Sequence, residues 1–254
     1  MKIFLSSLEH GIRLENSWLK DVKNLPFRLK YNLVSYYYLK NSGCLKRATY
    51  IRDNSELMLV DSGAHSFQKG KRVEWETYVD EYAKFIQTFD KPNILGFFEI
   101  DIDAIVGYPR VLELRRKLMN VSNKIIPVWH KGRGIAEFNK MCRDFQGKII
   151  AVSGFKNEDI KDDQYLMFLK RAKQYGCKMH CLGMTRRDVL DKVPFDFVDS
   201  SSWNSPVRYA VMNGRKIDSD WIRIAKNRDL VELEAYKRGM AMQREYEEKW
   251  RNYL

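Results

Sequence analysis

The sequence has few cysteines and no long apolar run. It contains 4 cysteines among 254 residues, at positions 44, 142, 177 and 181, and no CxxC pair. That is too few for a disulfide framework in a chain of this length, which favours a reducing compartment. No stretch approaches the ~20 consecutive apolar residues of a membrane-spanning helix, and the apolar run after Met1 is too short for a signal peptide. We therefore expect a cytoplasmic protein with no membrane partner.

Residues that bind metals are scarce as well. The sequence has only 4 histidines, and one of them lies in a segment with Cys177, His180 and Cys181. These three could be imagined as zinc ligands, but zinc sites need a specific ligand geometry. A helix that ends at Cys177, followed by a buried strand that contains Cys181, explains the same residues without a metal. We expect neither a metal nor a cofactor.

Acidic residues are outnumbered by basic ones. Lys and Arg total 45 against 33 Asp and Glu, which leaves a net charge of +12 and a pI of about 9.4. Such an excess favours a polyanionic partner such as nucleic acid, although a merely soluble basic protein can have the same composition. The 44% of hydrophobic and 13% of aromatic residues exclude a mainly disordered chain and supply the core of one large domain.

Short apolar runs alternate with segments of helical spacing. We predict strands over residues 3–8, 57–60, 94–98, 124–129, 148–152, 179–182 and 195–198, and helices over 75–89, 111–119, 136–145, 162–175, 188–193 and 229–254. An eighth strand is expected around 207–212 or near Ile217, and the aromatic stretch 31–39 stays unassigned. Such alternation is typical of parallel strands joined by right-handed crossovers. The pattern predicts an α/β fold: a single (β/α)8 barrel domain over residues 1–254 with a C-terminal helical extension.

Polar residues gather where the predicted strands end. In a barrel of this kind the chemistry lies on the loops that follow the strands. Carboxylates at the ends of buried strands are partly desolvated, which raises their pKa and suits them to acid–base or nucleophilic work. A single Asp or Ser there could equally cap the next helix, but the same placement after three strands indicates a shared site. The residues concerned are Asp61, Ser62, Gly63, Glu99, Asp101, Asp103, His130, Ser153, Gly154, Asp199 and Ser200.

Four segments resemble the tRNA-guanine transglycosylase superfamily. Residues 60–64, VDSGA, look like its DSGG segment. Residues 180–184, HCLGM, followed by DVLDKV at 188–193, are similar to its YLMGVG…DLLEAV stretch. Residues 195–203, FDFVDSSSW, resemble its DLFDS nucleophile segment, and AVSGF at 151–155 takes the place of its Gly-Gly substrate loop. The four occur in the family's order, with barrel spacing, over residues 57–203.

The sequence also departs from that superfamily. The family carries a zinc site of the form C-x-C-x-x-C with a later His near its C-terminus, and no cysteine follows Cys181 here. The aromatic residue expected soon after the Gly-Gly pair is displaced to Phe67, and the chain is shorter than the bacterial tRNA enzymes. The compact, zinc-free form is similar to the bacterial and phage enzymes that place 7-deazaguanines into DNA. For a phage enzyme the compartment would be the host cytoplasm.

The resemblance implies a pentosyltransferase that exchanges guanine in DNA for a free 7-deazaguanine. Asp199 would attack C1′ of the target nucleoside, expel guanine and form a covalent sugar ester. Asp61 would then act as general base and take the N9 proton of the incoming base. The configuration at C1′ is retained, as in retaining glycosidases, with a nucleobase in place of water.

The remaining site residues follow from the same resemblance. One carboxylate among Glu99, Asp101 and Asp103 is expected to bind the guanine N1–H and exocyclic amine, and alternation would point Asp101 and Asp103 to the same side. The other expected base-binding residues are His65, Phe67, His130, Ser153, Gly154 and Leu182. Residues expected to contact phosphates, although each could equally be an ordinary solvated side chain, are Lys69, Lys71, Arg72, Arg186, Arg187 and Arg208. A base in a duplex must flip out to reach such a pocket, unless the strand is single.

Three other functions stay open. A tRNA-guanine transglycosylase would use the same residues on tRNA. A metal-dependent hydrolase would use His130 and His180 as ligands and Asp199 to activate water, but the first predicted strand lacks the His-x-His pair of such enzymes. A non-catalytic nucleic-acid-binding protein would need neither Asp61 nor Asp199. A helper protein or a second copy of the chain is left open as a partner.

Overall fold

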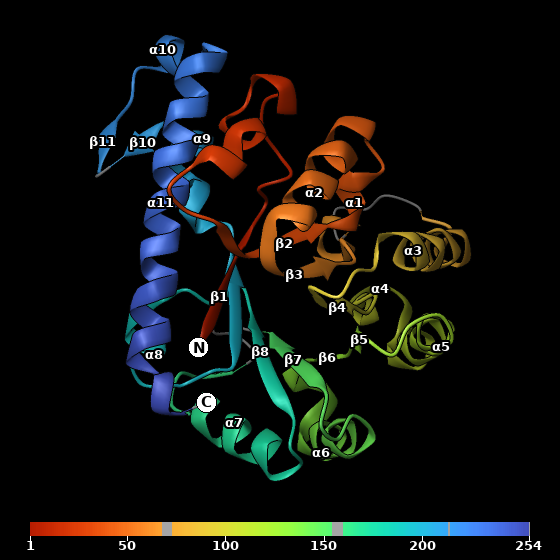
Figure 1. Cartoon of the computed structure of the whole chain (residues 1–254). Coiled ribbons are helices and arrows are strands. Elements are labelled where there is room, and N and C mark those ends of the chain that lie inside the picture. Colours follow the sequence, from red (N-terminus) through yellow and green to blue (C-terminus); the bar gives the residue numbers. More distant parts are fainter. Residues whose placement is uncertain (68–72, 154–159, 213, 254) are drawn as a thin grey trace.

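The computed structural model describes residues 1–67, 73–153, 160–212 and 214–253. Within these residues, nine strands form one sheet in which all neighbours run parallel (Figure 1). Their order is β5-β4-β3-β2-β1-β9-β8-β7-β6. The strands are β1 (Lys2–Ser6), β2 (Leu29–Ser35), β3 (Ser55–Asp61), β4 (Ile94–Phe98), β5 (Ile125–Ile126), β6 (Val128–Trp129), β7 (Ile149–Ser153), β8 (Lys178–Leu182) and β9 (Phe197–Ser200).

The two ends of this order belong to one piece of chain. Only Pro127 separates β5 from β6, and these two short strands pair with β4 and β7 respectively. Proline has no N–H to donate to a ladder, but the Pro127 carbonyl accepts a hydrogen bond from Ala151 N at 2.8 Å. β5 and β6 therefore act as one strand, and the sheet closes into a parallel barrel of eight strands. The predicted (β/α)8 fold class is confirmed.

The predicted eighth strand is wrong. Residues 207–212 include the end of α9 (Ser205–Tyr209) and β10 (Val211–Met212), which pairs with β11 (Arg215–Lys216) in a separate antiparallel hairpin. The strand that completes the barrel is instead β2, which begins before the unassigned aromatic stretch and ends within it. The other seven predicted strands all correspond to strands of the barrel.

The sequence of β2 does not look like a strand, because polar residues interrupt its apolar run. Asn32 is fully buried. Its amide donates to Ser55 Oγ at 2.9 Å, and its carbonyl oxygen accepts from Tyr236 Oη at 3.0 Å. A buried polar side chain with partners of this kind is stable, but the partners lie 23 and 204 residues away. The local sequence therefore contains no sign of them.

Helices surround the barrel (Figure 1). The predicted helix over 75–89 coincides with α3, and the C-terminal helix predicted from residue 229 begins earlier, as α11. No helix of the described residues combines the length and the apolar character needed to cross a membrane. Besides α9, the helices are α1 (Tyr36–Leu39), α2 (Ser42–Asn54), α3 (Trp75–Phe89), α4 (Asp103–Val106), α5 (Tyr108–Met119), α6 (Gly134–Asp144), α7 (Tyr165–Gln174), α8 (Arg187–Leu190), α10 (Ser219–Arg223) and α11 (Ala225–Lys249).

The last helix covers the first two strands. The connection from β1 to β2 contains only the 3-10 turns η1 (Leu14–Asn16) and η2 (Trp18–Asn24), and α11 lies along this side of the barrel (Figure 1). The Gln243 amide donates to the carbonyls of Ile3 and Tyr31 at 2.8 and 2.9 Å, which ties the helix to both strands. At Gly239 an added Cβ would lie 2.7 Å from the Leu5 side chain, so a larger residue there would force Leu5 to shift.

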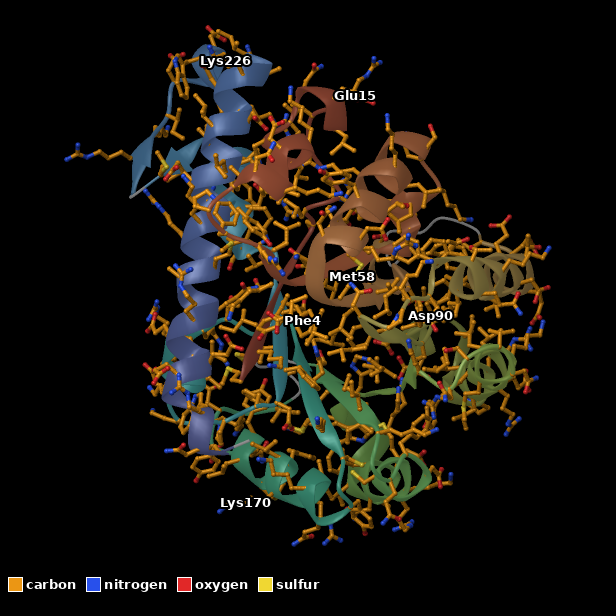
Figure 2. The ribbon with its side chains drawn as sticks, in the orientation of Figure 1. Phe4, Glu15, Met58, Asp90, Lys170 and Lys226 are labelled. Carbon is orange, nitrogen blue, oxygen red and sulfur yellow. The ribbon has the colours of Figure 1, made fainter. Side chains whose placement is uncertain are left out.

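Apolar side chains fill the barrel, and charged ones lie outside it. The labelled Phe4 lies at the centre of Figure 2, whereas Glu15, Lys170 and Lys226 lie at the periphery. The interior cluster consists of Phe4, Tyr31, Leu33, Leu59, Phe98, Ile126, Val128, Ala151 and Phe197. Two further clusters fill the space between strands and helices. The barrel is thus a packed core whose open chemistry is confined to its ends.

We predict that Gln243→Ala destabilises the protein by about 1–3 kcal/mol, because it leaves two buried carbonyls without their donor. Chemical denaturation at pH 7 measures this change. Gln87→Ala, on the exposed face of α3, is the matched control and should shift the free energy of unfolding by less than about 0.5 kcal/mol. Equal effects of the two substitutions would contradict the bridging role of Gln243.

Candidate active site

Asp61 lies at the end of β3 in a partly closed environment. One of its oxygens, Oδ2, accepts hydrogen bonds from Ser35 Oγ at 3.0 Å and from Gly63 N at 2.9 Å. Gly63 has a φ of 82°, and a Cβ at this position would lie 2.3 Å from that of Tyr37, so only glycine fits this turn. Burial raises the pKa of Asp61 to about 6; the two hydrogen bonds lower it, and the charges of Asp199 and Asp101 raise it further. Asp61 therefore exchanges its proton at about pH 6, much closer to neutrality than an ordinary aspartate.

Asp199, in β9, is held differently. Its Oδ1 lies 2.8 Å from His180 Nε2 and accepts from Gly183 N at 3.1 Å. His180 is fully buried inside the barrel, with its ring against those of Phe4 and Phe98. Asp199 Oδ2 has no donor among the described residues. Within the described part of the chain, this buried carboxylate thus has hydrogen-bond donors at one oxygen only.

A third group lies beyond β4 and β6. Asp101 Oδ2 is 2.7 Å from His130 Nε2, and Arg133 donates to Asp101 Oδ1 at 3.2 Å and to Asp103 Oδ2 at 2.9 Å. Burial alone would raise the pKa of Asp103, but the hydrogen bond and charge of Arg133 outweigh it, and the pKa is lowered. These residues line a pocket of about 630 Å³ together with Tyr108 and others. Asp101 and Asp103 share the Arg133 guanidinium, although they follow β4 and do not alternate within it.

The same group has the composition of a metal site. One ligand atom each from Asp101, Asp103 and His130 lies within 4.8 Å of the others. Arg133 already donates to both carboxylates, so a divalent cation there would meet a buried guanidinium at close range. The ligand set weighed for a hydrolase does not assemble, because His130 pairs with Asp101 whereas His180 pairs with Asp199.

Glu99 does not join the candidate site. Its carboxylate is fully buried, binds Arg115 of α5 through both oxygens, and accepts from Val128 N at 2.7 Å. Burial raises its pKa more than Arg115 lowers it. Glu99 therefore fastens α5 to the barrel and has no surface for a ligand. β4 ends at Phe98, so strand alternation does not extend to the acids that follow.

The other predicted residues are only partly described. Ser153 ends β7 and Leu182 ends β8, and the two are paired in register. Gly154, Lys69, Lys71 and Arg72 lie outside the described residues, as do the side chains of His65 and Phe67 in the turn η3 (Ala64–Phe67). The roles expected for these last six residues therefore stay predictions.

The described arginines of the predicted phosphate set differ in their partners. Arg186 forms a bidentate ion pair with Asp162, and Arg187 binds Glu245 at 2.6 and 2.9 Å. Arg208 is exposed, and its Nη1 donates to Ser201 Oγ at 3.1 Å, two residues after Asp199. Arg208 has no acidic partner within the described chain and lies beside the nucleophile segment.

Sequence reasoning missed Arg133, Ser35 and Glu9. Arg133 follows His130 by three residues, close enough to a predicted site residue to have been considered. Glu9 follows β1 and Ser35 ends β2, both at the same end of the barrel as Asp61. The sequence pattern did not reveal β2. Correct strand boundaries would have indicated both.

Comparison with protein-family models and with curated proteins gave no match for this chain. The family assignment thus stays a resemblance of motifs.

We predict that Asp61→Asn stabilises the protein at alkaline pH. The pKa of Asp61 is raised from 3.8 to about 6 in the folded state, so its contribution to stability is full below about pH 4 and is lost as pH rises to 6. The amide cannot ionise, so the variant should exceed the wild type by about 1–2 kcal/mol at pH 8, allowing for partial exposure.

Thermal and chemical denaturation at pH 4 and pH 8 measure this difference, which should nearly vanish at pH 4. Asp80→Asn is the control, because the Asp80 side chain is 61% exposed. The same pH dependence in both variants would contradict the desolvation of Asp61.

Proposed function

We propose that this protein exchanges guanine in DNA for a 7-deazaguanine by double displacement. The observation that carries the proposal is the contrast between two aspartates at one end of the barrel. Asp199 has one oxygen held by two donors and one without a donor among the described residues, which suits a nucleophile. Asp61 has a pKa raised to about 6, which suits a group that must give and take a proton near neutral pH.

In the first half-reaction, Asp199 Oδ2 attacks C1′ and the C1′–N9 bond breaks, with its electron pair going to N9 of guanine. Asp61 in its acid form protonates that nitrogen, and neutral guanine leaves. In the second half-reaction, the Asp61 carboxylate takes the N9 proton of the incoming 7-deazaguanine, whose nitrogen attacks C1′. The C1′–O bond to Asp199 then breaks, and both aspartates regain their starting states. Two inversions give retention.

His180 supports the nucleophile. Donation from Nε2 to Asp199 Oδ1 orients the carboxylate and leaves Oδ2 directed to the reacting carbon. Nδ1 of His180 is buried without a hydrogen-bond partner among the described residues, which fits a neutral ring with its proton on Nε2. A neutral partner leaves the negative charge of Asp199 available for attack.

Asp101 is the favoured reader of the base. Its charge contributes to the raised pKa of Asp61, so it lies within electrostatic reach of the proton-transferring group. Carboxylate oxygens accept from the N1–H and exocyclic amine that guanine and 7-deazaguanines share. Arg133 and His130 hold Asp101 in place, and Asp103 shares Arg133.

DNA is the proposed polymer. The net charge of +12 and the exposed Arg208 next to the nucleophile segment support a phosphate backbone at this end of the barrel. The target nucleotide must be unpaired or flipped out to reach Asp199. A tRNA substrate is the second candidate, since the same two aspartates would serve it.

We predict that substitution of the two aspartates has different effects on the covalent DNA–protein intermediate. Asp61→Asn keeps the nucleophile but can neither protonate the departing guanine nor deprotonate the incoming base. It should therefore form a covalent DNA–protein adduct slowly, retain it, and exchange bases about 10²–10⁴-fold more slowly. Asp199→Asn should form no adduct and exchange no base. Denaturing gels detect the adduct, and nucleoside mass analysis detects the inserted 7-deazaguanine.

DNA and tRNA of equal concentration are run side by side. Insertion into tRNA alone would replace DNA as the substrate, and an adduct formed by Asp199→Asn would show that another residue is the nucleophile. Asp188→Asn, whose side chain is 65% exposed, is the control for the loss of a carboxylate.

We predict that Arg208→Ala lowers DNA affinity for all sequences alike and reduces the slope of log Kd against log salt by about one. Arg187→Ala is the matched control, because Glu245 already neutralises that guanidinium. Fluorescence anisotropy over 50–300 mM salt, roughly the range in which phosphate contacts dominate, measures both slopes. Equal slopes for Arg208→Ala and the wild type would remove Arg208 from the nucleic-acid interface.

A further inference from the structure

Glu9 is a buried carboxyl that the reaction above does not use. It follows β1 at the same end of the barrel as Asp61, and only 1% of its surface is exposed. Its Oε1 accepts from the backbone N–H of Ser35 at 3.1 Å. Its Oε2 is buried without a hydrogen-bond partner among the described residues. An unpartnered, buried carboxyl oxygen disfavours the ionised form.

A strained turn brings Glu9 to this position. Ser7 has a φ of 74°, in the left-handed region that residues other than glycine seldom adopt. The turn closes with a hydrogen bond from His10 N to Ser7 O at 3.3 Å. Strain of this kind persists only where the surroundings enforce it, and it gathers at functional sites. The placement of Glu9 beneath Ser35 is therefore a specified feature of the fold.

Ser35 connects Glu9 to Asp61. Its backbone N–H donates to Glu9 Oε1, and its hydroxyl donates to Asp61 Oδ2 at 3.0 Å. Two carboxyls that share a neighbour and are shielded from water do not both ionise at low cost. We infer that Glu9 is a positioning residue for Asp61, and that the two carboxyls form a coupled acid pair that retains one proton where Asp61 works.

The charges around the pair are consistent with this coupling. Burial raises the pKa of Glu9 to about 7; hydrogen bonding from Ser35 lowers it, the charge of Asp61 raises it, and Arg47 lowers it. Arg47 also binds Glu232, Leu8 O and Ser17, so its charge is shared. Glu9 interacts electrostatically with Asp61, Arg47, Cys44 and His10. Asp61 interacts electrostatically with Asp101, Asp199, Tyr78 and Tyr82.

The catalytic meaning of the pair rests on the proposed function. When pH rises through about 7, Glu9 ionises and places a second negative charge beside Asp61. This charge opposes the electron pair that arrives on N9 of the leaving guanine, and the pair has lost its last proton. Exchange already declines as Asp61 loses its proton near pH 6, and it should decline more steeply above about pH 7 because of Glu9. In Glu9→Gln the side chain stays neutral and still offers an oxygen to the Ser35 N–H.

The direct test is a carboxyl titration by ¹³C NMR on protein labelled at Asp and Glu. The signal that is absent from Glu9→Gln should titrate near pH 7 in the wild type. In Asp61→Asn it should move to lower pH by about one unit, because the neighbouring charge is gone. A Glu9 that titrates near pH 4.5, or at the same pH in both proteins, would overturn the coupling.

The second test compares pH profiles of base exchange. Wild-type exchange should decline above about pH 6 as Asp61 loses its proton and more steeply above about pH 7, and in Glu9→Gln only the steeper part should disappear. Glu113→Gln, on the exposed face of α5, is the control and should keep the wild-type profile. Superimposed profiles of Glu9→Gln and the wild type overturn the role of Glu9.

The two tests separate the two proposals. A wild type that exchanges no base at any pH contradicts the proposed function, whereas the NMR titration still decides whether the pair is coupled. If Glu9→Gln does not fold, the Glu9 signal is identified as the glutamate signal that titrates near pH 7 in the wild type. Its titration in Asp61→Asn then decides whether the two carboxyls are coupled.

Discussion

Closure of the sheet at Pro127 is the constraint on which the rest of the molecule depends. One short run of chain pairs with β4 through β5 and with β7 through β6. Closure removes both sheet edges, and it brings the ends of strands from both halves of the chain to one place. Asp61 from β3 and Asp199 from β9 lie at the same end of the barrel, with β2 and β1 between their strands.

Closure also creates an electrostatic cost. Asp61, Asp101 and Asp199 carry like charges at the same end of a packed barrel, and each has a different set of donors. A serine hydroxyl and a backbone amide meet Asp61, a buried histidine meets Asp199, and a guanidinium with an imidazole meets Asp101. Different donors keep the proton affinities of neighbouring carboxyls apart, as acid–base chemistry requires.

The sequence allowed the barrel, and the placement of Asp61 and Asp199 at the ends of its strands, to be predicted, because both depend on local signals. Apolar runs of strand length, each followed by polar residues, indicated seven strands and the edge at which they end. β2 was missed because the stability of Asn32 depends on Ser55 and Tyr236, which are distant in sequence. Glu99 was misjudged because its partner Arg115 lies one helix away. Side chains that are fixed by tertiary partners have no local pattern.

The covering of β1 and β2 by α11 has a consequence for how the chain folds. The bond from Gln243 to Ile3 O joins residues 240 apart, and Trp18 Nε1 donates to Glu232 across 214 residues. During synthesis the first strand emerges long before the helix that shields it, and its neighbour β9 is also late. Contacts of such long range slow folding and leave apolar surface open in the meantime. β1 and β2 therefore gain their cover only after α11 has left the ribosome, and a chaperone that binds exposed apolar strands would act during this interval.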